Sequence, residues 1–315
     1  MLIALSAVLP IMMLIATGLI VVKLDWVSEQ FPQVLNRYVM QIAAPALLFR
    51  NTALTPFPDE PPWGLWLGYY GSMLPIFFLG YALARLSGRG YSHQEGFVIG
   101  FGSTFSNTIM LGIPVILTAF GPKAELPLYL ILAFHGLYFL TFMTLCMELS
   151  QPRGLDWSKL WRAILSALAR QNVLVAIIAG VTYGAVGFTF APFVDRFLSL
   201  LGESTIPVAL VMTGAILARV RVRSAINIAL CVAGLKIIAQ PLLTYCVGRY
   251  LLGLPELWVA VMTVLAAMPS GLFTNIFAES YQAASEEASS LIVLSTSASA
   301  VTLTIILSLF AEFLV

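Results

Sequence analysis

Two apolar stretches of this sequence are interrupted by the same small set of residue types. Residues 103–114 read STFSNTIMLGIP and residues 267–276 read AMPSGLFTNI, so each places Asn, Ser or Thr, Gly and Pro together. Proline lacks a backbone donor and glycine loosens a helix, so several peptide groups lose their intrahelical partners. In lipid such groups persist only beside protein or a water-filled cavity. Free amides and half-helix N-termini carry partial positive charge, which suits a carboxylate ligand.

We therefore expect a substrate-binding site where the two interruptions meet. Its candidate residues are Ser106, Asn107, Thr108, Gly112 and Pro114 in the first, and Pro269, Ser270, Gly271 and Asn275 in the second. The two asparagine side chains can add amide donors and acceptors. Gln41, Thr17 and Thr213 are weaker candidates for the pathway, because such residues often only join helices. For one segment alone, an ordinary proline kink explains the pattern equally well.

Two ionisable residues fall inside apolar segments. Lys236 lies in GLKIIAQP, where a charge at the helix centre costs about 2.5–3.5 kcal/mol on insertion scales. We expect it to face the interior and to offset negative half-helix ends or attract an anion; the alternative is a lysine that snorkels outward. His135, in AFHGLY, titrates near neutral pH and could relay a proton, or could simply be packed and neutral. No Asp or Glu falls at the centre of an expected helix.

The composition identifies the elements that must position these residues. The chain has 315 residues, of which 60 % are hydrophobic and 10 % charged, whereas soluble domains carry about 25 % charge. A water-solvated monomer is excluded, and 16 basic against 15 acidic residues offer no basic field for nucleic acid. Because about 20 apolar residues cross the hydrocarbon core, we expect ten membrane helices. They lie at about 2–22, 33–53, 64–86, 93–120, 126–148, 165–189, 203–219, 225–252, 256–282 and 287–314.

Basic residues predict the orientation. Connections after odd-numbered helices hold eleven Lys and Arg, and those after even-numbered helices hold four. The odd connections are therefore expected to be cytoplasmic, with both termini on the outer side of the cytoplasmic (plasma) membrane.

An internal repeat predicts the topology. Shifting the chain by 162 residues places Pro45 on Pro207, Gly18 on Gly180 and Asn107 on Pro269. We expect a first five-helix repeat at 1–153, a cytoplasmic linker at 154–162 and a second repeat at 163–315. Five helices per half require the second copy to be inverted, as in many secondary transporters. The expected fold is all-α, with broken helices 4 and 9 crossing each other.

Several motifs resemble those of the auxin efflux carrier family, which includes plant auxin exporters and many bacterial transporters. They are SNTIMLGIP at 106–114, AAMPSG at 266–271 with FA at 277–278, LNRY at 35–38 with APALLF at 44–49, and the helix from 206 to 214. The resemblance implies a panel of helices 1, 2, 6 and 7 and a mobile bundle of helices 3–5 and 8–10. It also implies elevator-type movement of organic anions, with the crossover as the binding site. The long central loop of the plant members is missing, which favours a bacterial-type carrier of dicarboxylates such as malonate.

Together these patterns predict a secondary transporter that moves a small organic anion across the lipid bilayer by alternating access. A sodium-coupled symporter of the bile-acid type, which shares the inverted five-helix plan, is one alternative; a membrane sensor that binds its ligand without moving it is another. We expect no enzyme, cofactor or metal, because the sequence has no nucleotide loop, zinc spacing or catalytic pair. By analogy with carriers that pair through a static panel, a homodimer is a candidate assembly.

Overall fold

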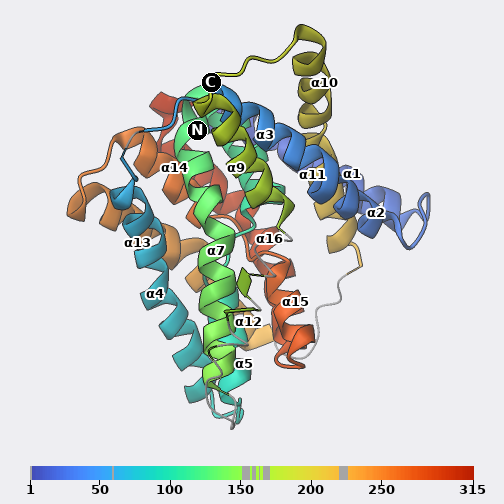
Figure 1. Ribbon diagram of the computed structural model, residues 1–315. Helices are drawn as coiled ribbons and strands as arrows, with labels where there is room; N and C mark the ends of the chain where they lie inside the picture. Colours follow the sequence, from blue (N-terminus) through green and yellow to red (C-terminus); the bar gives the residue numbers. More distant parts are fainter. Residues whose placement is uncertain are drawn as a thin grey trace.

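The computed structural model describes residues 2–58, 60–150, 157, 161–162, 164–165, 171–219 and 226–315. Within these residues every named element is a helix (Figure 1). Five described stretches are long and apolar enough to cross a membrane: Trp63–Leu86, Thr108–Leu149, Pro192–Leu217, Ile226–Leu251 and Ser285–Leu309. The expectation of an all-α, multi-pass membrane protein is confirmed at this level. The linker expected at 154–162 lies outside the described residues, apart from Trp157, Trp161 and Arg162.

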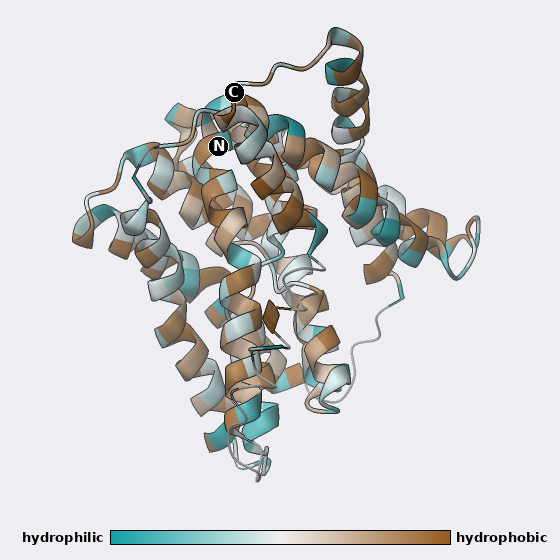
Figure 2. Cartoon of the chain, in the orientation of Figure 1, coloured by the Kyte–Doolittle hydropathy of each residue, from teal (hydrophilic) through white to brown (hydrophobic). Residues whose placement is uncertain are grey.

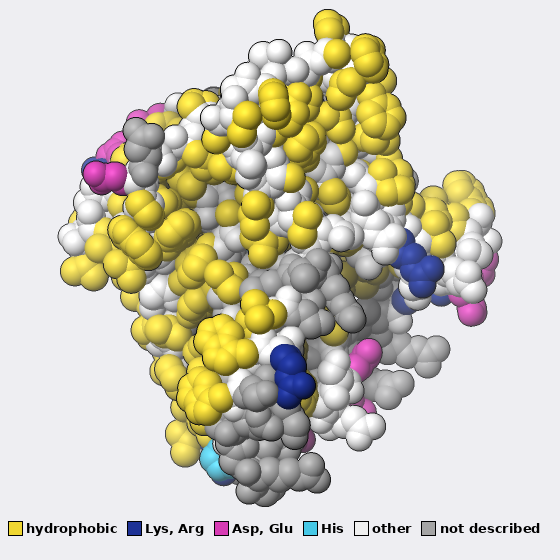
Figure 3. All heavy atoms as spheres, viewed as in Figure 1, with side chains coloured by type: hydrophobic (Ala, Val, Ile, Leu, Met, Phe, Trp, Pro, Cys, Tyr) yellow, Lys and Arg dark blue, Asp and Glu magenta, His cyan; other side chains and the backbone are white. Residues whose placement is uncertain are grey.

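The surface has the character of a lipid-facing one. Large apolar side chains stand exposed along several helices; Phe78, Leu242 and Val301 are 56 %, 62 % and 64 % exposed. Hydrophobic residues dominate the helices (Figure 2). They also cover most of the described part of the visible face, where charged side chains are few (Figure 3). So large an apolar surface is rare on a soluble monomer.

Before the linker, the described residues form ten helical elements. These are α1 (Leu2–Lys23), α2 (Phe31–Tyr38), η1 (Val39–Ala43), α3 (Ala44–Leu54), α4 (Trp63–Leu86), α5 (His93–Gly102), η2 (Thr108–Gly112), α6 (Ile113–Phe120), η3 (Gly121–Ala124) and α7 (Glu125–Leu149). After it come α9 (Asn172–Ala185), α10 (Pro192–Glu203), α11 (Thr205–Leu217), α12 (Ile226–Gly234), η4 (Leu235–Ala239), α13 (Gln240–Cys246), η5 (Val247–Leu251), α14 (Glu256–Ala266), α15 (Phe273–Ser280), α16 (Ser285–Leu309) and η6 (Ala311–Phe313). The starts of α5 and α14 are 163 positions apart, and each helix is followed by a break. This spacing agrees with the expected offset, while the inverted repeat itself stays a prediction.

Prolines explain three local widenings of the helices. Each of the π-helical turns η1, η2 and η4 ends two residues before a proline, namely Pro45, Pro114 and Pro241. Proline has no N–H, and its ring clashes with the carbonyl four residues earlier. The backbone N–H just before each proline therefore reaches the carbonyl five residues back, as Gln240 does to Leu235. The third of these π-helical turns, η4, contains Lys236.

The closest helix contacts form two groups, which also touch each other where α1 meets α16 and α6. α1 packs on α11, and α3 packs on α9 and α10. The other group joins α4 with α5, α12 with α16, and α13 with α14. In Figure 1, α1, α2, α3, α10 and α11 lie toward the upper right, and α4, α5 and α12 extend toward the bottom.

The contact between α1 and α11 depends on two glycines. A Cβ atom on Gly18 would lie 1.8 Å from the carbonyl oxygen of Val211, and one on Gly214 would lie 1.8 Å from that of Ile15. Only a missing side chain allows the two backbones to approach this closely. The two glycines thus allow α1 and α11 to pack as a tight helix pair.

Candidate functional site

Both interrupted segments are non-helical and lie against each other. The first joins the end of α5 at Gly102 to η2, and the second joins the end of α14 at Ala266 to α15. Ser106 and Ser270 form an isolated antiparallel bridge. The backbone N–H of Asn107 donates to the carbonyl of Pro269 at 2.9 Å, and that of Gly271 donates to the carbonyl of Phe105 at 3.0 Å. Peptide groups that lost their helical partners are therefore paired across the crossover.

The residue types at the crossover suit this close pairing. A Cβ atom on Gly271 would lie 2.5 Å from the ring of Phe105, and one on Gly112 would lie 2.8 Å from Leu265. Pro269 offers only its carbonyl, which is the group the bridge uses. The N–H of Ser270 donates to the hydroxyl of Ser295 at 3.1 Å. These residues therefore build the crossover with their backbones, and their side chains are small because neighbouring atoms leave no room.

Lys236 is fully buried and its ammonium group uses three acceptors. Its Nζ atom donates to the hydroxyl of Ser106 at 2.9 Å, to Oε1 of Gln240 at 2.7 Å and to the carbonyl of Ala266 at 2.6 Å. Ala266 is the last residue of α14, so the positive charge lies at the negative end of that half-helix. The alternative of an outward-snorkelling lysine is excluded by this geometry.

Gln240, the first residue of α13, makes a corresponding contact with the other broken helix. Its Nε2 atom donates to the carbonyl of Thr104, just past the end of α5, at 3.1 Å. Gln240 is fully buried, like Lys236. The two side chains, four residues apart, satisfy carbonyls released at both breaks. Gln240 was missed by sequence reasoning, although its position one turn after a buried lysine was a usable signal.

A cavity of about 320 Å³ lies beside the crossover. Its wall comes from α2 and η1, from the first break and η2, from α7, from the start of α9 and from α15. The polar lining residues are Asn36, Gln41, Ser106, Asn107, Thr108, His135, Gln171 and Asn172. None of the lining residues is Lys, Arg, Asp or Glu. The wall is mostly apolar, and apart from the His135 imidazole its polar side chains are amides and hydroxyls. Its volume suits a small organic molecule.

The structure separates the predicted site residues into two sets. Ser106, Asn107, Thr108 and His135 line the cavity. Gly112, Pro114, Pro269, Ser270 and Gly271 belong to the crossover and its packing, outside the cavity wall. Asn275 also lies outside that wall, and its Oδ1 atom accepts a hydrogen bond from Ser289 on α16 at 3.3 Å.

Three lining amides were not predicted as site residues: Asn36, Gln171 and Asn172. Each is a polar residue near the end of an apolar segment, where an amide is common for unrelated reasons. A Cβ atom on Gly136 would lie 2.0 Å from Oε1 of Gln171. The missing side chain at Gly136, the glycine in AFHGLY, was therefore the sequence signal that another side chain packs at this position.

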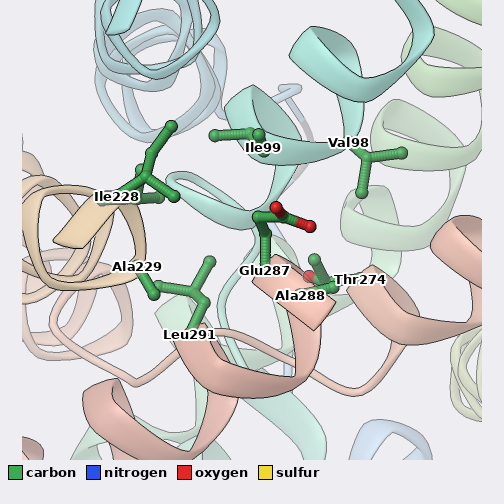
Figure 4. Close-up of a pocket in the computed structure, with 9 residues that line it drawn as sticks. Val98, Ile99, Ile228, Ala229, Thr274, Glu287, Ala288 and Leu291 are labelled. Carbon is green, nitrogen blue, oxygen red and sulfur yellow. The ribbon is translucent and has the colours of Figure 1, made fainter. Parts of the chain in front are cut away.

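A second hollow, of about 10 Å³, lies among α5, α12, α15 and α16. The Glu287 carboxylate stands there among Val98, Thr274 and Leu291 (Figure 4). The hydroxyl of Tyr91 donates to Oε1 of Glu287 at 2.7 Å. This hollow has room for about one water molecule, so it cannot hold an organic anion.

A polar network joins the two helix groups away from the cavity. Arg50 of α3 holds Asp195 of α10 through two hydrogen bonds of 2.7 and 3.0 Å. The next residue, Asn51, donates to the hydroxyl of Tyr129 on α7 at 2.8 Å and to Oε1 of Glu125 at 3.4 Å. The first contact joins α3 to α10, and the second joins α3 to α7.

Comparison with known proteins places the chain in a family. A family model described as "Membrane transport protein" matches residues 3–307. The chain belongs to this family. Its membership confirms the resemblance to the auxin efflux carriers that the motifs indicated. Among relatives of this membrane transport protein, one from Rhizobium meliloti (strain 1021) is named "Putative malonate transporter". It is 25 % identical over 302 residues, which cover 94 % of this chain and 92 % of the relative.

Proposed function

We propose that this protein is a secondary-active transporter of a small carboxylate, and that the cavity beside the crossover binds it. One observation carries the proposal: two broken helices pair at Ser106 and Ser270, and a mostly apolar cavity that gathers several amide and hydroxyl side chains lies directly beside them. Amide N–H groups bind a carboxylate without a buried countercharge. The family and the name of the Rhizobium relative agree with a dicarboxylate such as malonate.

The protein works by elevator-type alternating access in this proposal. The panel is α1, α2, η1, α3, α9, α10 and α11, and the bundle is the rest of the described helices. Cavity residues come from both groups: Asn36 and Asn172 from the panel, and Asn107 and His135 from the bundle. A bundle that slides along the panel would carry its half of the site and leave the other half behind. The substrate would thus be released as the site comes apart.

The cavity faces the cytoplasm in the same proposal. Its walls include α2, the start of α9 and α15, which adjoin connections that the basic residues predict to be cytoplasmic. The contact of Asn51 with Tyr129 would then close the outer side. Figure 1 draws both ends of the chain at one end of the molecule, which supports two termini on the same, outer side. The membrane is the cytoplasmic one.

Binding and flux of malonate together test the function. Purified protein is heated with malonate or with malonamide, the uncharged diamide of similar shape, with and without sodium. A ligand that binds the folded state raises its stability by about 2.7 kcal/mol at 100 times its Kd. We expect malonate or a related dicarboxylate, and not malonamide, to raise the melting temperature without sodium.

The same carboxylate is then followed into proteoliposomes. We expect flux from the native protein and from Thr182→Ala, whose hydroxyl bonds only to its own helix at Ile178. Binding without flux would favour a sensor, and flux that follows a sodium gradient would favour the bile-acid-type symporter. If no small carboxylate shows either binding or flux, the proposal is overturned.

A further inference from the structure

His135 is a buried imidazole. The residue is 5 % exposed, and among the described residues neither Nδ1 nor Nε2 has a partner that meets hydrogen-bond geometry. Buried polar side chains almost always have one, and an unsatisfied group costs about 1–3 kcal/mol. The ring lines the cavity beside the crossover. Both nitrogens are almost fully covered in this state, so one of them can meet a ligand in that cavity only when the ring turns.

The surroundings of His135 contain no carboxylate among the cavity's lining residues. Phe105 and Phe139 close two sides of the ring, with centroid distances of 5.3 and 4.7 Å. Tyr69 and Tyr70 of α4 lie at 6.2 and 6.1 Å, and both are uncharged phenols. Tyr138, on the same helix as His135, packs on Tyr70 at 4.6 Å. These aromatic side chains hold the imidazole ring in place and offer no negative charge to pair with it.

Lys236 is the charged group on the facing element. Its ammonium reaches the cavity wall at Ser106, and its other two hydrogen bonds go to Gln240 and to the carbonyl of Ala266, outside that wall. A fixed positive charge at the wall disfavours a second cation in the empty cavity, whereas a bound carboxylate favours one. The imidazolium and the anion would therefore stabilise each other.

We propose that His135 takes up one proton when the anion binds and that the two cross together, so the proton is the coupling ion. The inference rests on the proposed function. The proton comes from water on the side that the cavity faces, adds to a ring nitrogen, and is held as N–H donating to a carboxylate oxygen. On the opposite side the anion leaves and the ring returns the proton to water. A monoanion then crosses without net charge, and a dianion crosses with one negative charge.

Proton uptake on binding is the first test. Malonate is added to the purified protein in a weakly buffered detergent solution that contains a pH indicator. We expect uptake of about one proton per bound anion, since binding is linked to protonation of the ring. The matched control is His93→Gln, which changes the second histidine of the chain; His93 lies outside the cavity and bonds Tyr81 at 2.6 Å. It should keep the wild-type uptake.

His135→Gln tests the residue, since glutamine keeps a hydrogen-bond donor and cannot carry the proton. In proteoliposomes with a clamped membrane voltage, we expect anion flux from this variant without accompanying proton movement or response to a pH gradient. Anion flux by the native protein with no proton movement would overturn the inference and leave the proposed function standing. Proton movement at the native ratio in His135→Gln would overturn it as well. If the native protein neither binds nor moves any small carboxylate, both proposals fall.

Discussion

The ammonium nitrogen of Lys236 lies 2.6 Å from the carbonyl oxygen of Ala266, where α14 ends. A helix that stops inside a membrane protein leaves carbonyls without partners, and its C-terminus carries about half a negative charge. The Lys236 ammonium group donates to one of these carbonyls and places a positive charge beside the negative helix end. Its third contact, to Ser106, reaches the other broken segment. One residue of η4 thus connects the two interruptions.

Removing the Lys236 charge is predicted to destabilise the crossover. In Lys236→Met, the acceptors on Ser106, Gln240 and Ala266 lose their common donor. The free energy of unfolding should fall by about 1–3 kcal/mol or more, the cost of leaving buried groups unsatisfied. Thermal unfolding in detergent measures this, with the exposed Lys23→Met as control. Anion flux should weaken more in Lys236→Ala than in Lys236→Arg; equal and unimpaired rates would remove the lysine from the mechanism.

Asn107→Ala is predicted to weaken anion binding more than Asn275→Ala does. The side chain of Asn107 lines the cavity, whereas that of Asn275 is bonded to Ser289 outside it. A hydrogen bond to a charged group contributes about 1.5–3 kcal/mol, which corresponds to roughly tenfold or more in Kd. The backbone contact of Asn107 with Pro269 survives the change, so the protein should remain folded. Wild-type affinity and flux in Asn107→Ala would contradict this assignment.

Gly214→Ala is predicted to disrupt the pairing of α1 with α11. The added carbon would overlap the carbonyl oxygen of Ile15, and overpacking of this kind typically costs about 1–3 kcal/mol. Gly71→Ala is the matched control, because no atom lies within 4 Å of the new carbon there. The melting temperature should fall in the first variant and hold or rise in the second. Equal melting temperatures would show that the close approach is not needed for stability.

Joining α3 to α7 is predicted to stop transport. Cysteines replace Asn51 and Tyr129 in a background where Cys146, Cys231 and Cys246 are serine, and a reducible bifunctional reagent links them. Because α3 belongs to the proposed panel and α7 to the proposed bundle, the link should hold the bundle on the panel. Flux should fall to background and return on reduction.

The control for this cross-link places cysteines at Tyr81 and His93. These side chains are 2.6 Å apart and both belong to the bundle, on α4 and at the start of α5. Linking them should leave flux unchanged. Transport at full rate through the α3–α7 link would rule out relative movement of the two groups at this point.

The sequence alone indicated the membrane character and the two breaks. It did not indicate α10, because Pro192–Glu203 lies in a stretch expected to be a connection. Apolar content decides whether a segment enters lipid. The breaks depend on proline and glycine, whose effect acts within a few residues of backbone. Pro114 and Pro269 therefore marked them without any knowledge of the rest of the chain.

Only the tertiary structure decided which side chains meet. Lys236 is 130 positions from Ser106 and 30 from Ala266, and no local pattern encodes such contacts. Asn36, Asn107 and Asn172 come to one cavity because helices from both groups turn those faces inward. Asn275 looked equivalent to Asn107 in sequence, yet its helix directs it to α16. Each residue turns a helix by about 100°, so the packing of whole helices, and not residue type, decides whether a polar side chain reaches the cavity.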